Sequence, residues 1–110
     1  MGHREFHALQ AAELVEDRIN LLDHGSTRLL HSAQLRSSCH SIVGNISEGV
    51  GRDQPGERSR SYRVARFEAE ETIKHLRASA TTKRLDMKTY FALRSTLITI
   101  AKMLDSLNGG

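Results

Sequence analysis

Apolar side chains recur along this chain at alternating spacings of four and three residues, and short polar stretches interrupt the repeat. Near the N-terminus the repeat consists of Ala8, Ala12, Val15, Ile19 and Leu22. Because each residue of an α-helix turns by about 100°, positions at this spacing share one face, and the pattern predicts an amphipathic helix. The same reasoning predicts four helices, at about residues 4–23, 33–50, 55–82 and 87–108.

The predicted helices are joined by short connections, so successive helices should run in opposite directions. A chain of 110 residues is long enough to bury one hydrophobic core. We therefore expect an all-α fold, an antiparallel up-down-up-down four-helix bundle in which residues 1–110 form a single domain. In the third helix the inward positions are predicted to be Tyr62, Ala65, Ala69, Thr72, Leu76 and Ala80.

Three residues mark where these helices begin. Ser32 and Asp86 precede the second and fourth apolar repeats, and their side-chain oxygens are suited to cap a helix N-terminus. Pro55 is suited to the first turn of the third helix, where a missing backbone N–H does no harm.

The run from Gln34 to Arg52 combines an apolar stripe with a polar row. The stripe consists of Leu35, Cys39, Ile42, Val43, Ile46 and Val50. The polar row consists of Ser41, Asn45, Glu48 and Arg52. Such a row is suited either to structural hydrogen bonds between helices or to contact with a nucleic acid or protein partner. In the structural interpretation, replacing Asn45 or Glu48 by alanine would destabilise the fold by about 1 to 3 kcal/mol.

Apolar residues outnumber those that one bundle core requires. In the fourth helix they spread over about 240° of the helical wheel, far wider than the stripe of an ordinary surface helix. Leu14 and Leu21 form a second stripe on the first helix, and Phe67 lies opposite the inward face of the third. Isolated exposed apolar residues are normal, but extra stripes on several helices favour a subunit interface. The pattern itself predicts no copy number.

The net charge of +3 is concentrated in one segment. Between residues 52 and 66 there are two acidic residues and five arginines, namely Arg52, Arg58, Arg60, Arg63 and Arg66. The planar guanidinium group suits phosphate, so the segment is a candidate nucleic-acid-binding patch. The alternative is a solvated surface on which the arginines pair with nearby carboxylates.

Several functional classes find no support in the sequence. The single cysteine excludes an internal disulfide and favours a reducing, cytoplasmic location. No apolar run is long enough to span a bilayer. No nucleophile has an evident base. His3 and His7 have the spacing of the histidines in H-E-x-x-H but not the order of that motif, and Glu71 and His75 are four residues apart rather than the three of a Glu-x-x-His pair. We expect no catalytic residues, no metal and no cofactor.

Parts of the sequence resemble a known family. QLR at residues 34–36 and SIVGNISEGVGR at residues 41–52 are similar to the signature of the 23S rRNA intervening-sequence proteins, the S23 family. The similarity continues through Val64, Ala65 and Glu71 and ends at residues 102–104. Relatives of that family include accessory proteins of diversity-generating retroelements. The resemblance implies a four-helix bundle that forms a closed ring of five copies.

These observations predict a non-enzymatic, cytoplasmic homo-oligomer, a pentamer if the resemblance holds. Its arginine patch would bind RNA or DNA, with Leu14, Leu21 and Phe67 at the subunit interface. The alternative is a structural module that binds a protein, such as an accessory subunit of a reverse transcriptase.

Overall fold

The computed structural model describes residues 2–24 and 28–108, and nearly all of them lie in four helices. The helices are α1 (His3–Leu22), α2 (Ser32–Val50), α3 (Pro55–Thr81) and α4 (Met87–Leu107). Every predicted helix is present, and each predicted end lies within one residue of the observed end. The described helices contain no segment long and apolar enough to cross a lipid bilayer.

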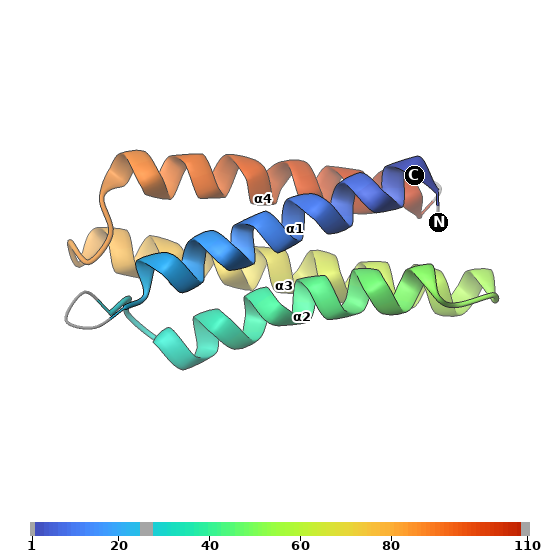
Figure 1. The fold of residues 1–110 in the computed structure, drawn as a ribbon, viewed down its shortest axis with the longest axis horizontal. Helices are drawn as coiled ribbons and strands as arrows, with labels where there is room; N and C mark the ends of the chain where they lie inside the picture. Colours follow the sequence, from blue (N-terminus) through green and yellow to red (C-terminus); the bar gives the residue numbers. More distant parts are fainter. Residues whose placement is uncertain (1, 25–27, 109–110) are drawn as a thin grey trace.

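The helices form an elongated bundle in which consecutive helices run in opposite directions (Figure 1). α2 and α3 form the most extensive contact, and α1 and α4 also pack together to close the bundle. α1 and α3 therefore lie diagonally opposite each other. The molecule measures 44 × 20 × 19 Å.

The core contains the residues that the periodicity predicts. All six inward positions of α3 are buried, as are the first four members of the α1 repeat. α2 contributes Leu35, Cys39, Ile42 and Ile46, and α4 contributes Tyr90, Leu93, Leu97, Ile100 and Leu104. Burying a leucine or isoleucine side chain contributes roughly 1.5–3 kcal/mol, so these residues supply most of the stabilisation of the bundle.

Two of the three predicted helix starts are confirmed. The Asp86 carboxylate accepts hydrogen bonds from the Thr89 backbone N–H at 2.8 Å and from its hydroxyl at 2.7 Å. Pro55 is in the first turn of α3. Both residues therefore act as the sequence predicts.

Ser32 does not cap α2, and that prediction was wrong. His31 occupies the cap position in a left-handed conformation (φ 54°), and its side chain forms no capping hydrogen bond. Ser32 lies in the first turn and donates its hydroxyl to the carboxylate of Asp23. The buried carboxylate of Asp23, directly after α1, thus accepts a hydrogen bond from the hydroxyl that the local sequence assigns to a cap.

Gly49 is buried near the end of α2 because the Tyr62 ring lies directly against its backbone. A Cβ atom at Gly49 would lie 2.5 Å from Cε1 of Tyr62, which is closer than two carbons can approach. A Cβ atom at Gly44, on the same helix, would meet nothing within 4 Å. Only Gly49, of these two glycines, is required for packing.

Candidate interaction site

The outer face between α2 and α3 contains two shallow hollows. The first has a volume of about 370 Å³ and is lined by Asn45 and Glu48 of α2, by Arg52 just beyond its end, and by Glu57, Arg60, Ser61 and Val64 of α3. The second has a volume of about 570 Å³ and is lined by Ala33, Gln34, Ser37, Ser38, Phe67, Glu68, Glu71 and His75. We refer to these residues together as the α2/α3 face.

The α2/α3 face brings together residues that the sequence analysis identified separately. Three members of the polar row line the first hollow beside Arg60. Phe67, whose side chain is 57% exposed, lines the second hollow, one helical turn from Val64 in the first. Polar groups and an exposed aromatic ring therefore lie on the same face, which is an arrangement suited to a partner of mixed polarity.

The side chains of the polar row form their hydrogen bonds with one another or with the backbone of α2. Asn45 donates to the Ser41 backbone oxygen at 2.9 Å and to the Ser41 hydroxyl at 3.0 Å. Arg52 forms an ion pair with Glu48 at 2.7 Å, and both side chains are about half exposed. Among the described residues, no side chain of the row forms a hydrogen bond with another helix, and Arg58 of α3 contacts only the Arg52 backbone oxygen. The structural role, as hydrogen bonds between helices, therefore gains no support, and the row remains available to a partner.

The five arginines lie in different places. Arg52 and Arg60 line the α2/α3 face. Arg58 reaches toward the end of the bundle and donates two hydrogen bonds to the Arg52 backbone oxygen, at 3.0 and 3.3 Å. Arg63 is exposed and donates to the Ser59 hydroxyl at 2.8 Å. The arginines do not point toward one common surface.

Arg66 links α3 to α4 rather than pointing to solvent. It forms ion pairs with Glu70 and with Asp105 of α4, each at 2.8 Å. The hydrogen bond and the charge of Asp105 raise the pKa of Arg66. Arg52 is likewise paired with Glu48, so part of the positive charge of this segment is neutralised by carboxylates outside it. Within the described ranges, Arg60 and Arg63 have no carboxylate at ion-pair distance.

The predicted interface residues belong to two different faces. Leu14 and Leu21 of α1 are 64% and 78% exposed, and Phe67 is on the diagonally opposite helix α3. Other large apolar side chains are also exposed, namely Phe6, Val64, Met87 and Phe91. A single flat patch would not explain this distribution.

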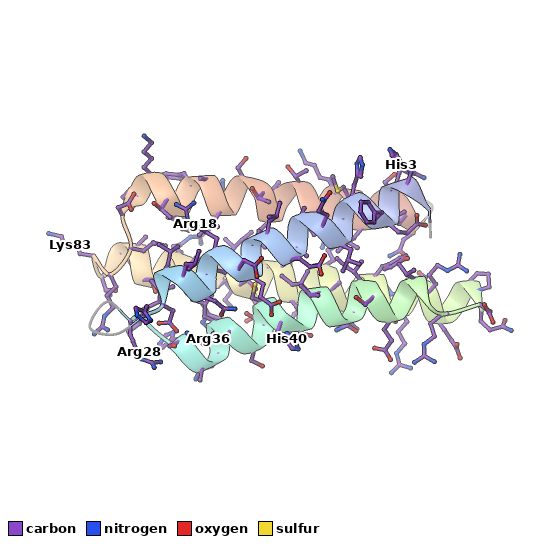
Figure 2. The ribbon with its side chains drawn as sticks, viewed as in Figure 1. His3, Arg18, Arg28, Arg36, His40 and Lys83 are labelled. Atoms are coloured by element: carbon purple, nitrogen blue, oxygen red, sulfur yellow. The ribbon has the colours of Figure 1, made fainter. Side chains whose placement is uncertain are left out.

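The polar network at the α1–α2 connection was not predicted. Asp23 is 1% exposed, and its carboxylate accepts hydrogen bonds from the Leu29 backbone N–H and from Arg36 Nε, both at 2.8 Å, as well as from Ser32. Arg36 also donates to the Asp23 backbone oxygen. Figure 2 shows Arg36 near the start of α2, close to this connection. Arg36 belongs to the QLR motif, and this arginine was the residue from which the sequence could have indicated an ion pair.

The hydrogen bonds to Asp23 determine its ionisation. Burial alone would raise the pKa of this carboxyl, but the hydrogen bonds from Ser32, Leu29 and Arg36 and the charge of Arg36 outweigh burial and lower it. Asp23 is therefore a carboxylate at neutral pH. It links the end of α1 to Leu29 and to the first turns of α2, which is a structural role.

Two further polar contacts involve sequence candidates. His40, labelled on α2 in Figure 2, lies 2.7 Å from Glu16 of α1. Cys39 is buried, and burial, with a smaller effect of the Glu16 charge, raises the pKa of its thiol to about 12. A thiol with this pKa is a poor nucleophile at neutral pH. No set of three His, Cys, Asp or Glu side chains in residues 2–24 and 28–108 is placed to hold a metal ion.

The chain was compared with known proteins. The sequence model of the 23S rRNA-intervening sequence protein family matches residues 7–106. A crystal structure of a protein of unknown function from the S23 ribosomal protein family of Bacteroides thetaiotaomicron superimposes with a TM-score of 0.88. The two sequences are 22% identical, and the match covers 97% of this chain and 99% of that one, so it shows a common fold. A search of curated proteins found no match.

Proposed function

The chain belongs to the 23S rRNA-intervening sequence protein family, and we propose that it is a non-enzymatic binding module that assembles into a homo-oligomer. In this assembly the α2/α3 face of one copy receives Leu14 and Leu21 of the next. The observation that carries the proposal is the exposure of large apolar side chains on two diagonally opposed helices.

Two different patches on one molecule favour a head-to-tail contact. A two-fold dimer needs a single self-complementary patch, whereas a contact between unlike patches leaves one of each unused at the ends and continues until a ring closes. Phe67 and the hollow beside it would receive the leucines, and the polar row would supply hydrogen bonds at the edge of the contact. A ring of five copies is the closed form that we propose.

Light scattering tests the assembly directly. At micromolar concentration the mass should be several times the 12.3 kDa of one chain. Phe67→Glu and the double variant Leu14→Glu/Leu21→Glu should each reduce it to one chain, while circular dichroism shows unchanged helicity. Phe91→Glu replaces an equally exposed aromatic residue on α4 and serves as the matched control.

Mixing the two variants distinguishes a head-to-tail contact from a two-fold one. Each variant retains one intact patch, so an equimolar mixture should form heterodimers of twice the chain mass and nothing larger. A monomeric wild type, or variants that remain monomeric when mixed, would contradict the proposed interface.

A second candidate function is binding of RNA or DNA through phosphate. It is favoured by Arg60 and Arg63, which have no carboxylate at ion-pair distance among the described residues and would be repeated around a ring. Binding through such contacts is weakly sequence-selective, and log affinity falls with log salt by roughly 0.7 to 0.9 per phosphate neutralised. A gel-shift titration against RNA and DNA at several salt concentrations measures this dependence.

The appropriate charge reversal is Arg60→Glu/Arg63→Glu. Arg66 must be left unchanged because its reversal would break the ion pairs with Glu70 and Asp105 and disturb the packing of α3 on α4. The control is Lys88→Glu/Lys102→Glu, an equal change of charge at exposed positions of α4. If wild type retards neither nucleic acid, or if both double variants bind as well as wild type, the second candidate fails and a protein partner for the α2/α3 face takes its place.

A further inference from the structure

α1 begins, α2 ends and α3 begins at the same end of the bundle (Figure 1). A small cleft lies among residues of these three segments. Its volume is about 210 Å³, and it is lined by Gly2, Glu5, Val50, Arg58 and Tyr62. The α2/α3 face contributes none of these side chains. The cleft is therefore separate from the surface to which we assign assembly.

Tyr62 is the unusual member of this cleft. The residue is 1% exposed, yet its hydroxyl forms no hydrogen bond with any described residue. Native proteins rarely leave a buried hydroxyl unpaired, because the group loses its hydrogen bonds to water and gains none in return. The edge of the ring lies against the backbone of Gly49, where a Cβ atom would collide with it.

Two opposite charges lie near that hydroxyl. Burial raises the pKa of Tyr62, the Glu5 carboxylate raises it further, and the Arg58 guanidinium lowers it. Both charged groups line the cleft. Arg58 uses Nε and Nη2 to bind the Arg52 backbone oxygen, which leaves the hydrogens of Nη1 for another acceptor.

We propose that this cleft binds a small zwitterion of the α-amino acid class. The carboxylate of the ligand would accept hydrogen bonds from the Tyr62 hydroxyl and from Arg58, and its ammonium group would donate to Glu5. A simple anion would be repelled by Glu5 and a simple cation by Arg58, whereas a zwitterion satisfies both. The same contacts would complete the hydrogen bonding of the buried hydroxyl.

Nuclear magnetic resonance titration of the full chain tests the proposal, with glycine as the probe. The ring signals of Tyr62 should shift with millimolar glycine and reach saturation. Acetate and methylammonium, each carrying one half of the probe, should cause no saturable shift at equal ionic strength. The ring signals of Tyr90, at the opposite end of the bundle, provide an internal reference, because its hydroxyl already accepts a hydrogen bond from Arg77 at 3.1 Å.

Two variants separate binding from folding. Tyr62→Phe removes only the unpaired hydroxyl, so it should leave the melting temperature unchanged or raised and weaken glycine binding about tenfold. Tyr90→Phe is the matched control and should bind glycine like wild type. Glu5→Gln removes the repulsion of anions, so this variant should bind acetate, which wild type does not.

Three outcomes would overturn the proposal. Glycine shifts Tyr62 no more than acetate and methylammonium do, or Tyr62→Phe binds glycine as tightly as wild type, or Glu5→Gln gains no affinity for acetate. These results are independent of assembly, because light scattering of Tyr62→Phe and Glu5→Gln should give the wild-type mass in either case.

Discussion

The polar side chains at the two ends of α2 differ in their surroundings. At its start, Ser32 and Arg36 converge on Asp23, a carboxylate that is almost completely buried. At its end, the side chains of Asn45, Glu48 and Arg52 form hydrogen bonds only with neighbours four residues away and line a hollow. The sequence makes the second group look like the structural one because its spacing is regular. Regular spacing therefore indicates only that residues share a face of a helix. Whether they have a structural role depends on which groups of the other helices contact that face.

The largest expected effect is at Asp23. Asp23→Ala should lower the free energy of unfolding by about 3 kcal/mol, because the Leu29 N–H and the Ser32 hydroxyl lose a buried acceptor. The pair with Arg36 contributes less, since that side chain is 45% exposed. Urea denaturation followed by circular dichroism measures the change. Asp17→Ala, an exposed position on α1, is the control and should shift stability by less than about 0.5 kcal/mol. A similar loss in both variants would remove the contrast between the two ends of α2.

At the other end of α2, the sensitive residue is Gly49 rather than any member of the polar row. Gly49→Ala should destabilise the protein by about 1–3 kcal/mol, since its methyl group would collide with the Tyr62 ring. Gly44→Ala, in open space on the same helix, should stabilise it by about 0.5–1 kcal/mol. Thermal unfolding of the two variants gives the sign of each effect. Two changes of the same sign would show that the Tyr62 ring does not occupy this position.

The Asp23 network should also make stability depend on pH. Because the folded-state pKa of Asp23 lies below its ordinary value of 3.8, the stabilisation is present above about pH 4 and is lost as the pH falls through the folded-state pKa. A single titrating group contributes at most about 1.4 kcal/mol per pH unit to the slope of the free energy of unfolding against pH. Hydrogen bonds from Thr89 lower the pKa of Asp86 as well, so wild type must be compared with Asp23→Asn, which retains Asp86. Denaturation between pH 2 and 6 should give a smaller slope for the variant. Equal slopes would show that Asp23 titrates alike in the folded and unfolded chains.

The smallest expected effects are in the polar row. Asn45→Ala and Glu48→Ala should each change the free energy of unfolding by less than about 0.5 kcal/mol, since each partner is only four residues away in sequence and the Glu48–Arg52 pair is half exposed. The sequence-based expectation of about 1 to 3 kcal/mol assumed buried partners on another helix. The same variants should reduce the oligomer mass in light scattering if the row lies at the edge of the subunit contact. If either variant lowered the free energy of unfolding by more than about 1 kcal/mol, the structural interpretation of the row would be restored.

Helix positions and the bundle topology could be predicted because both depend on local features of the chain. The alternation of four and three residues identifies the inward positions of α1 and α3, and short connections require consecutive helices to reverse direction. Pro55 and Asp86 were predicted correctly for the same reason, since each acts on the helix that it begins. The exposure of Leu14, Leu21 and Phe67 also follows from their angular positions on these helices.

The sequence by itself thus determined the four helices, the side that each one buries and the apolar residues that remain outside. Only the tertiary structure decided which polar groups meet. Asp23 accepts a hydrogen bond from the Ser32 hydroxyl, Asp105 pairs with the guanidinium of Arg66, and the Tyr62 hydroxyl has no hydrogen-bond partner among the residues that the structure describes. The physical reason is the distance along the chain over which each effect acts. Periodicity acts within one helix, whereas a hydrogen bond requires two atoms to come within about 3 Å, and that is set by how the helices pack against one another.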